Sequence, residues 1–295
     1  RGDLMHLLTL ILAALVFLNS SVQGAEYKLS GTFHVAVKDP SGLTYDPVHD
    51  SLWTVRDHGS GLAEKLMGGG GGLFEIDKKG KVLKKMPLKA SNDLEGIAYR
   101  ADTDTFLLAE ERNREVVEID RAGKTLRTIK VPIKWGYRDL NHGIEGVAYD
   151  PKSKSIFVAN EKNPRQVMEL TEDGNVASSF EVSEASDISD LYYDATTGRL
   201  LVLSHENILL EFTRKGQLIK TFPVEADKAE GVTKDSKGYL YVICEATSTL
   251  YVYAPEVIPA SAPVPVTPQA TTEKAGGKGA SQRTPAKPKS SGSKK

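Results

Sequence analysis

The stretch Gly143–Asp150 reads GIEGVAYD, and it returns with small changes along the chain. A close copy, DLEGIAY, spans Asp93–Tyr99, and a shorter one, AEGV, spans Ala229–Val232. Two weaker copies, SGLTYD and SDLYYD, begin at Ser41 and Ser189. The unit therefore occurs five times, at spacings of about 40 to 54 residues. A repeat of this length is typical of solenoids and propellers.

Each unit continues in the same order. A turn-forming stretch comes first, then a β-rich run such as Ile156–Ala159, then a run that alternates apolar and polar residues and ends in glycine, such as Val116–Gly123. A fourth short run follows the glycine. Four short strands joined by tight turns, without helical periodicity, are the pattern of a propeller blade. The sequence therefore predicts an all-β fold, a five-bladed β-propeller.

The last unit has only three strands before it ends at Tyr253. A fourth is found at the other end of the folded region, where LSGTFHV at Leu29–Val35 matches LIKTFPV at Leu218–Val224, the outer strand of the preceding unit. We expect residues 28–36 to form the outer strand of the last blade. The ring would then be closed and leave no open sheet.

The two ends of the chain differ in composition from the repeats. An apolar run of 12 residues, Leu7–Leu18, precedes small residues up to Ala25 and is short for a bilayer span. We expect residues 1–25 to be a signal peptide, with an N-terminal membrane anchor as the alternative. Residues 255–295 are rich in Pro, Ser and Lys and carry seven basic against two acidic side chains, which predicts a disordered basic tail. The propeller is assigned to residues 26–254.

Charge and cysteine content limit the possible functions. The chain of 295 residues has a net charge of −1, so the body is acidic once the basic tail is set apart. Cys244 is the single cysteine, which excludes an internal disulfide. We expect an exported monomer that is periplasmic, secreted or anchored outside the cell membrane, and that does not bind nucleic acid. Its expected partners are a small molecule or an envelope protein, with membrane or anionic envelope contact through the N-terminus and tail.

Acidic residues recur at two places in the units. One set opens the units, and the other follows 15 or 16 positions later. Strand, turn and antiparallel strand return the chain to the end where it began, so both sets are expected at one mouth of the channel. Ser41 replaces the opening acid in the first unit. The predicted inner ring is Glu95, Glu145, Asp190 and Glu230, and the predicted outer ring is Asp57, Glu111, Glu161, Glu206 and Glu245.

Converging carboxylates repel one another and require neutralisation. The outer ring has neighbouring cations, such as Arg112, Lys162 and Arg165, that offer local ion pairs. The inner ring has fewer, and its oxygen ligands suit Ca²⁺, which accepts roughly six to eight oxygens in flexible geometry. Magnesium requires a compact octahedron, and zinc prefers nitrogen or sulfur. We therefore predict Ca²⁺ at the inner ring, with the outer ring as a possible second set of ligands.

Taken together, the motifs resemble those of a known family. They are the acidic-Gly openings, the segments EER at Glu110–Arg112 and NEK at Asn160–Lys162, and the IDxxGK turns. They resemble the SdiA-regulated family of five-bladed β-propellers over residues 28–254. The resemblance implies export or membrane anchoring, a bound calcium ion and distant kinship to NHL-repeat propellers. Ser41 and the glycine run Gly68–Gly72 depart from the family pattern in the first blade.

Two classes of function remain. A binding module would hold a ligand or partner with the mouth loops Lys89–Asp93 and Lys134–Gly143, the second of which contains Trp135, Tyr137 and Arg138. The alternative is a calcium-dependent hydrolase, lactonase- or phosphoesterase-like, in which the metal polarises the substrate oxygen. Its candidate bases are His58, His142, His205, Asp57 and Glu110. We expect a binding module, because no histidine pair or nucleophile motif requires catalysis.

Overall fold

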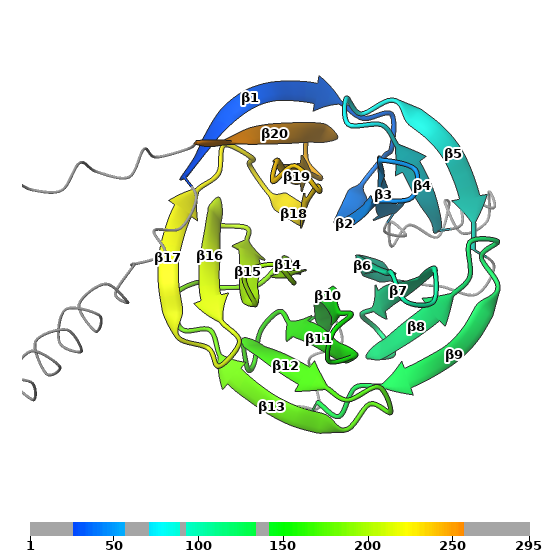
Figure 1. Ribbon diagram of the computed structural model, residues 1–295, viewed down its shortest axis with the longest axis vertical. Coiled ribbons are helices and arrows are strands. Elements are labelled where there is room, and N and C mark those ends of the chain that lie inside the picture. Colours follow the sequence, from blue (N-terminus) through cyan, green and yellow to red (C-terminus); the bar gives the residue numbers. More distant parts are fainter. Residues whose placement is uncertain (1–25, 57–70, 89–92, 134–141, 257–295) are drawn as a thin grey trace, which may run out of the picture. The chain divides into compact units, whose positions relative to one another are not determined.

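The computed structural model describes residues 26–56, 71–88, 93–133 and 142–256. Twenty strands form five four-stranded antiparallel sheets around a central axis (Figure 1). The predicted five-bladed β-propeller is confirmed. These ranges contain no helix, and hence none with the length and apolar character needed to cross a bilayer. The predicted leader at 1–25 and residues 257–295 of the predicted tail lie outside the described residues, whereas Pro255 and Glu256, predicted as the start of the tail, belong to the last strand.

The strands of each blade follow one another from the axis outward. Blade 1 contains β2 (Pro40–Asp46), β3 (Ser51–Arg56), β4 (Gly72–Ile76) and β5 (Val82–Pro87). Blade 2 contains β6 (Leu94–Arg100), β7 (Thr105–Glu110), β8 (Glu115–Ile119) and β9 (Thr125–Lys130). Blade 3 contains β10 (Ile144–Asp150), β11 (Ser155–Asn160), β12 (Gln166–Leu170) and β13 (Val176–Glu181). Blade 4 contains β14 (Asp190–Asp194), β15 (Arg199–Ser204), β16 (Ile208–Thr213) and β17 (Leu218–Pro223).

Blade 5 combines strands from both ends of the described chain. It contains β18 (Ala229–Lys234), β19 (Leu240–Cys244) and β20 (Thr249–Glu256), with β1 (Glu26–His34) as its outermost strand. β1 runs antiparallel to β20, from the pair Glu26 and Glu256 to the pair His34 and Thr249 (Figure 1). This pairing gives β20 a partner on its outer side, which an edge strand would lack.

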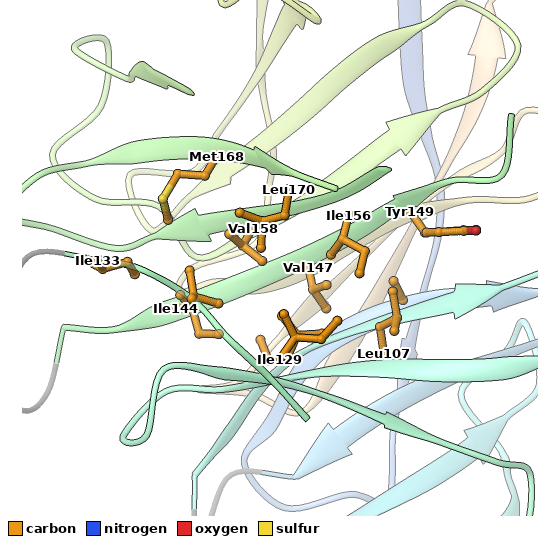
Figure 2. Packing of buried hydrophobic residues seen from close by; sticks show 14 residues of the cluster. Leu107, Ile129, Ile133, Ile144, Val147, Tyr149, Ile156, Val158, Met168 and Leu170 are labelled. Atoms are coloured by element: carbon orange, nitrogen blue, oxygen red, sulfur yellow. The ribbon is translucent and has the colours of Figure 1, made fainter. Parts of the chain in front are cut away.

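The core consists of apolar layers between neighbouring blades. Successive side chains of a strand face opposite sides, so Leu107 of β7 packs toward blade 3 while Leu108 packs toward blade 1. Figure 2 shows the layer between blades 2 and 3, where Leu107 and Ile129 meet Val147 and Ile156. Because both faces of β7 are covered, all six of its residues are buried.

An ion pair joins the two blades at each of the five interfaces, at the end of the channel where the inner strands finish. The partners are Lys78 with Asp235 at 3.0 Å, Arg121 with Asp46 at 2.7 Å, Arg214 with Asp150 at 2.6 Å, Lys234 with Asp194 at 2.6 Å, and Arg100 with Glu172. At the interface between blades 2 and 3 the two partners have the opposite arrangement, with the cation on the inner strand and the acid in the turn. Arg100 ends β6 where β2, β10 and β14 end in aspartate, and Glu172 stands where the equivalent turns carry Lys or Arg. This exchange preserves attraction at that interface and disfavours other pairings.

The inner strands approach one another too closely for a side chain at the glycine of the acidic-Gly motif. A Cβ atom on Gly146 of β10 would lie 2.7 Å from the backbone nitrogen of Leu191 in the next blade. Equivalent contacts of 2.5 to 2.6 Å exist at Gly42, Gly96 and Gly231. The fifth contact uses a side chain, because Oδ2 of Asp190 accepts the backbone N–H of Val232 at 2.8 Å. The five inner strands thus contact each other in a complete circle.

We expect Gly146→Ala to lower the free energy of unfolding by about 2 to 3 kcal/mol, because the added methyl meets backbone that cannot move alone. Urea unfolding of the purified protein measures this. Gly31→Ala in β1 is the matched control, since its Cβ would meet only the Phe33 ring, at 3.0 Å. Equal losses in the two variants would contradict the close approach at the axis.

Candidate metal centre

Acidic side chains line one mouth of the channel. A pocket of about 190 Å³ opens there, where the inner strands begin and the second strands end. All five blades contribute to it. Its lining residues are Ser41, Glu95, Glu111, Glu145, Glu161, His205, Glu230 and Glu245.

Local backbone structure places the opening acids in this pocket. Glu95, Glu145 and Glu230 each lie at a shift in register between the inner strand and its neighbour, and the residues on either side are paired normally. A bulge of this kind redirects the side chain of the extra residue. The glycine that follows each acid lies against the next blade, so the acid is held at the start of the strand and its carboxylate reaches the mouth.

Blade 4 is aligned one position differently from the spacing read in the sequence. Asp150 pairs with the first residue of β11, and Asp194 pairs with the first residue of β15, so these two aspartates are equivalent. Counting back from them, Ser189 corresponds to Glu145. Counting forward along the second strand, His205 corresponds to the outer acid of blade 3. The recurring Tyr-Asp pair that ends these inner strands is the sequence signal that identifies His205 as a residue of the mouth.

Two predicted ring members do not line the pocket. Asp190 occupies the position that Gly146 has in blade 3. Its fully buried carboxylate accepts a hydrogen bond from the N–H of Val232. Glu206 is exposed, and its Oε2 accepts the N–H of Ser186 at 3.0 Å. The structure does bring together the other predicted acids that it describes. Five predicted site or loop residues, Asp57, His58, Trp135, Tyr137 and Arg138, lie outside the described residues, as do residues 89–92 of the first mouth loop.

Three carboxylates converge at the centre of the cluster. Oxygen atoms of Glu111, Glu145 and Glu161 lie within 4.8 Å of one another, and Glu95 and Asp93 form a second such group with Glu111. Burial raises the pKa of Glu145 well above its ordinary value, and repulsion from Glu95 and Glu111 raises it further. Burial likewise raises the pKa of Glu111 to about 7, although the N–H of Gly143 donates to its Oε1 at 2.9 Å. The centre therefore holds carboxyl groups that resist ionisation.

Several acids around this centre have a cationic partner. Glu161 accepts Lys162 Nζ at 2.6 Å and lies 2.7 Å from His142 Nδ1. Lys228 Nζ lies 3.0 Å from Glu245 at the rim. These contacts lower the net negative charge of the outer acids without removing their oxygens from the mouth.

His205 neutralises another side of the mouth. Its Nε2 lies 2.9 Å from Oε1 of Glu230, and its Nδ1 lies 3.7 Å from Oδ2 of Asp187. Burial opposes protonation of the imidazole, but the adjacent carboxylates of Asp187 and Glu230 outweigh it and raise the pKa of His205 to about 10. The imidazole is therefore charged at neutral pH and does not accept a proton as a general base would.

We expect the stability of the protein stripped of divalent cations to fall as pH rises from 4.5 to 6.5. A carboxyl with a raised folded-state pKa binds its proton more tightly when folded, so its contribution is complete below the unfolded value of 4.5 and is lost as pH rises through about 7 for Glu111. This window lies below 6.5, the ordinary pKa above which the stabilising contribution of His205 begins to be lost. Urea unfolding at several pH values in a chelating buffer measures the slope. Glu111→Gln should reduce it, and a wild-type profile that is flat or rises would contradict the raised pKa.

Comparison with a family model places the chain among known proteins. The model described as SdiA-regulated matches residues 19–253, which is well over half of the chain. The match includes the whole run of strands from β1 to β19 and most of β20.

Solved structures with a similar fold have low sequence identity. A glutaminyl cyclase from Myxococcus xanthus is 12% identical with a TM-score of 0.58, over 80% of this chain and 98% of that one. A nidogen/laminin complex is 14% identical with a TM-score of 0.50, over 75% and 77%. An inactive virginiamycin B lyase from Staphylococcus aureus with quinupristin is 14% identical with a TM-score of 0.44, over 72% of this chain and 65% of that one, so this chain spans less than two thirds of the lyase. At these identities the likeness concerns the fold alone.

Proposed function

The chain belongs to the SdiA-regulated family, and we propose that it is an exported calcium-binding module of the cell envelope. Glu111 and Glu145 would hold the ion from the centre of the mouth, and Glu95 and Glu161 would hold it from either side. A ligand or partner protein would dock on the same face, and oxygen groups of that ligand would complete the coordination of the ion. Export is supported by the apolar run Leu7–Leu18 and the small residues that follow it.

One observation carries the proposal, namely the group formed by Glu111, Glu145 and Glu161. The exposed fraction of each of these residues is 8% or less, and their oxygens lie within 4.8 Å of one another. Buried like charges at this separation destabilise the fold unless they are protonated or share a cation. A divalent ion that binds all three removes the repulsion.

The chemistry of the group favours calcium. Calcium accepts roughly six to eight oxygen ligands in flexible geometry, from carboxylates, backbone carbonyls and water. The carboxylate oxygens of the group lie within 4.8 Å of one another, close enough to share one ion. Magnesium requires a compact octahedron and usually keeps several water ligands. Zinc favours nitrogen and sulfur, and the central group offers carboxylate oxygen.

The state of the histidines supports binding rather than hydrolysis. His205 is charged at neutral pH, and His142 lies against Glu161. Glu110 lies outside the pocket at the mouth. The described candidate bases therefore either contact an acid or lie outside the pocket. We assign the calcium ion a structural role, with open coordination positions for the oxygens of a ligand.

We expect calcium to raise the melting temperature and a chelator to lower it, because a ligand bound only by the folded state stabilises it by about 2.7 kcal/mol at a hundredfold excess over Kd. Glu145→Gln should abolish most of this response and should slightly stabilise the metal-free protein, because one repelling charge is gone. Differential scanning calorimetry with calcium and with chelator measures both effects.

Two further variants test the residue assignment. Glu206→Gln changes an exposed acid outside the pocket and should leave the calcium response intact. Asp190→Ala should lower stability equally with and without calcium, because the hydrogen bond that Asp190 accepts from the backbone N–H of Val232 is lost. An unchanged wild-type melting curve in calcium would refute the proposal, and so would a full calcium response in Glu145→Gln.

A further inference from the structure

A second cavity lies between blades 1 and 2 and shares no lining residue with the mouth. Its volume is about 490 Å³, within the range of roughly 300 to 1,000 Å³ that is usual for small-molecule sites. Apolar side chains from both blades form most of its wall. They include Leu88 after β5, Leu94 of β6, Leu108 of β7, and Val117 and Ile119 of β8.

Glu110 places a carboxylate in this apolar wall. It is the last residue of β7 and lines the cavity together with Leu108, two positions earlier on the same face of the strand. Its exposed fraction is 3%. Oε2 accepts the N–H of Asn113 at 2.7 Å, whereas Oε1 is buried and has no hydrogen-bond partner in the part of the chain that the structure describes. A buried carboxylate with an unpartnered oxygen destabilises the fold, so a positive charge bound beside Glu110 is favoured.

In blades 3 and 4 the residue equivalent to Glu110, the last residue of the second strand, is uncharged. Asn160 ends β11, and its side-chain nitrogen donates to the carbonyls of Lys162 and Pro164, both at 2.7 Å. Ser204 ends β15, and its hydroxyl donates to Asp187 at 2.9 Å. Uncharged side chains thus satisfy the adjacent loop in blades 3 and 4. In blade 2 the Oε2 of Glu110 serves the loop through the N–H of Asn113, and the second carboxylate oxygen has no such use among the described residues.

We propose that this cavity binds small organic amines with an apolar body, with the protonated nitrogen beside the carboxylate of Glu110. A carboxylate only accepts hydrogen bonds, and an ammonium group donates three with opposite charge, which gives the stronger, charge-assisted kind of bond. The leucine, valine and isoleucine walls cover the hydrocarbon part. Glu115, which is paired with Lys130, and Lys124 also line the cavity. The proposal is independent of the calcium site, because no residue is common to the two pockets.

Three amines serve as probes: 2-phenylethylamine, cyclohexylmethylamine and hexylamine. The full chain, saturated with calcium at pH 7, is titrated with each amine in a calorimeter. We expect saturable binding of at least one amine at a single site. Its alcohol analogue, for example 2-phenylethanol for 2-phenylethylamine, keeps the apolar body and loses the charge. It should bind at least about tenfold more weakly. Absence of saturable binding by all three amines would overturn the proposal, as would equal affinity for amine and alcohol.

Two variants locate the site. Glu110→Gln keeps the shape of the side chain and should remove the preference for the amine. Val117→Phe fills the cavity and should abolish binding of both probes while leaving Glu110 in place. The exposed Glu225 provides the control, and Glu225→Gln should bind the amine as the wild type does. Circular dichroism checks that each variant is folded. If the Val117→Phe variant does not fold, the Glu110→Gln variant alone decides whether the amine binds at this cavity. Amine binding that survives Glu110→Gln would place the site elsewhere.

Discussion

The close approach of five inner strands at the axis is the constraint on which the rest of this propeller depends. At Gly146 the space between the strand and its neighbour does not admit a Cβ atom, and the same holds at three other glycines. The residue before three of these glycines is a glutamate at a break in strand register, with its carboxylate in the mouth. Tight packing at the axis and the gathering of acids at one end are therefore consequences of the same two-residue motif.

The two ends of the inner strands have opposite electrostatic character. Where the strands finish, an ion pair joins each blade to the next, as Asp150 and Arg214 join blades 3 and 4. Where the strands begin, Glu111 and Glu145 repel one another and their pKa values are raised. Paired charges at one end hold the blades together, and unbalanced charges at the other end are the reason we propose an ion site there.

Blade 4 shows how a degenerate repeat is accommodated. Asp190 stands in the position of the glycine, and its side chain makes the contact to blade 5 that a bare backbone makes elsewhere. His205 stands in the position of an outer acid and contacts Glu230 of blade 5 across the interface. The blade thus supplies a positive charge to a mouth that is otherwise acidic. The circle of contacts stays complete although the motif is not.

The amino-acid sequence alone determined the number of blades, the four strands in each and the end of the channel at which the acids gather. Repeat length, period-two alternation and turn residues are local properties, and strand–turn–strand geometry then fixes which residues share an end. The tertiary structure decided which acids converge, how Asp190 and His205 are aligned, and that Glu110 faces a cavity. Each of these depends on contacts between different blades, whose residues are distant in the sequence. Only the packing of the closed ring sets such distances, to within a few ångströms.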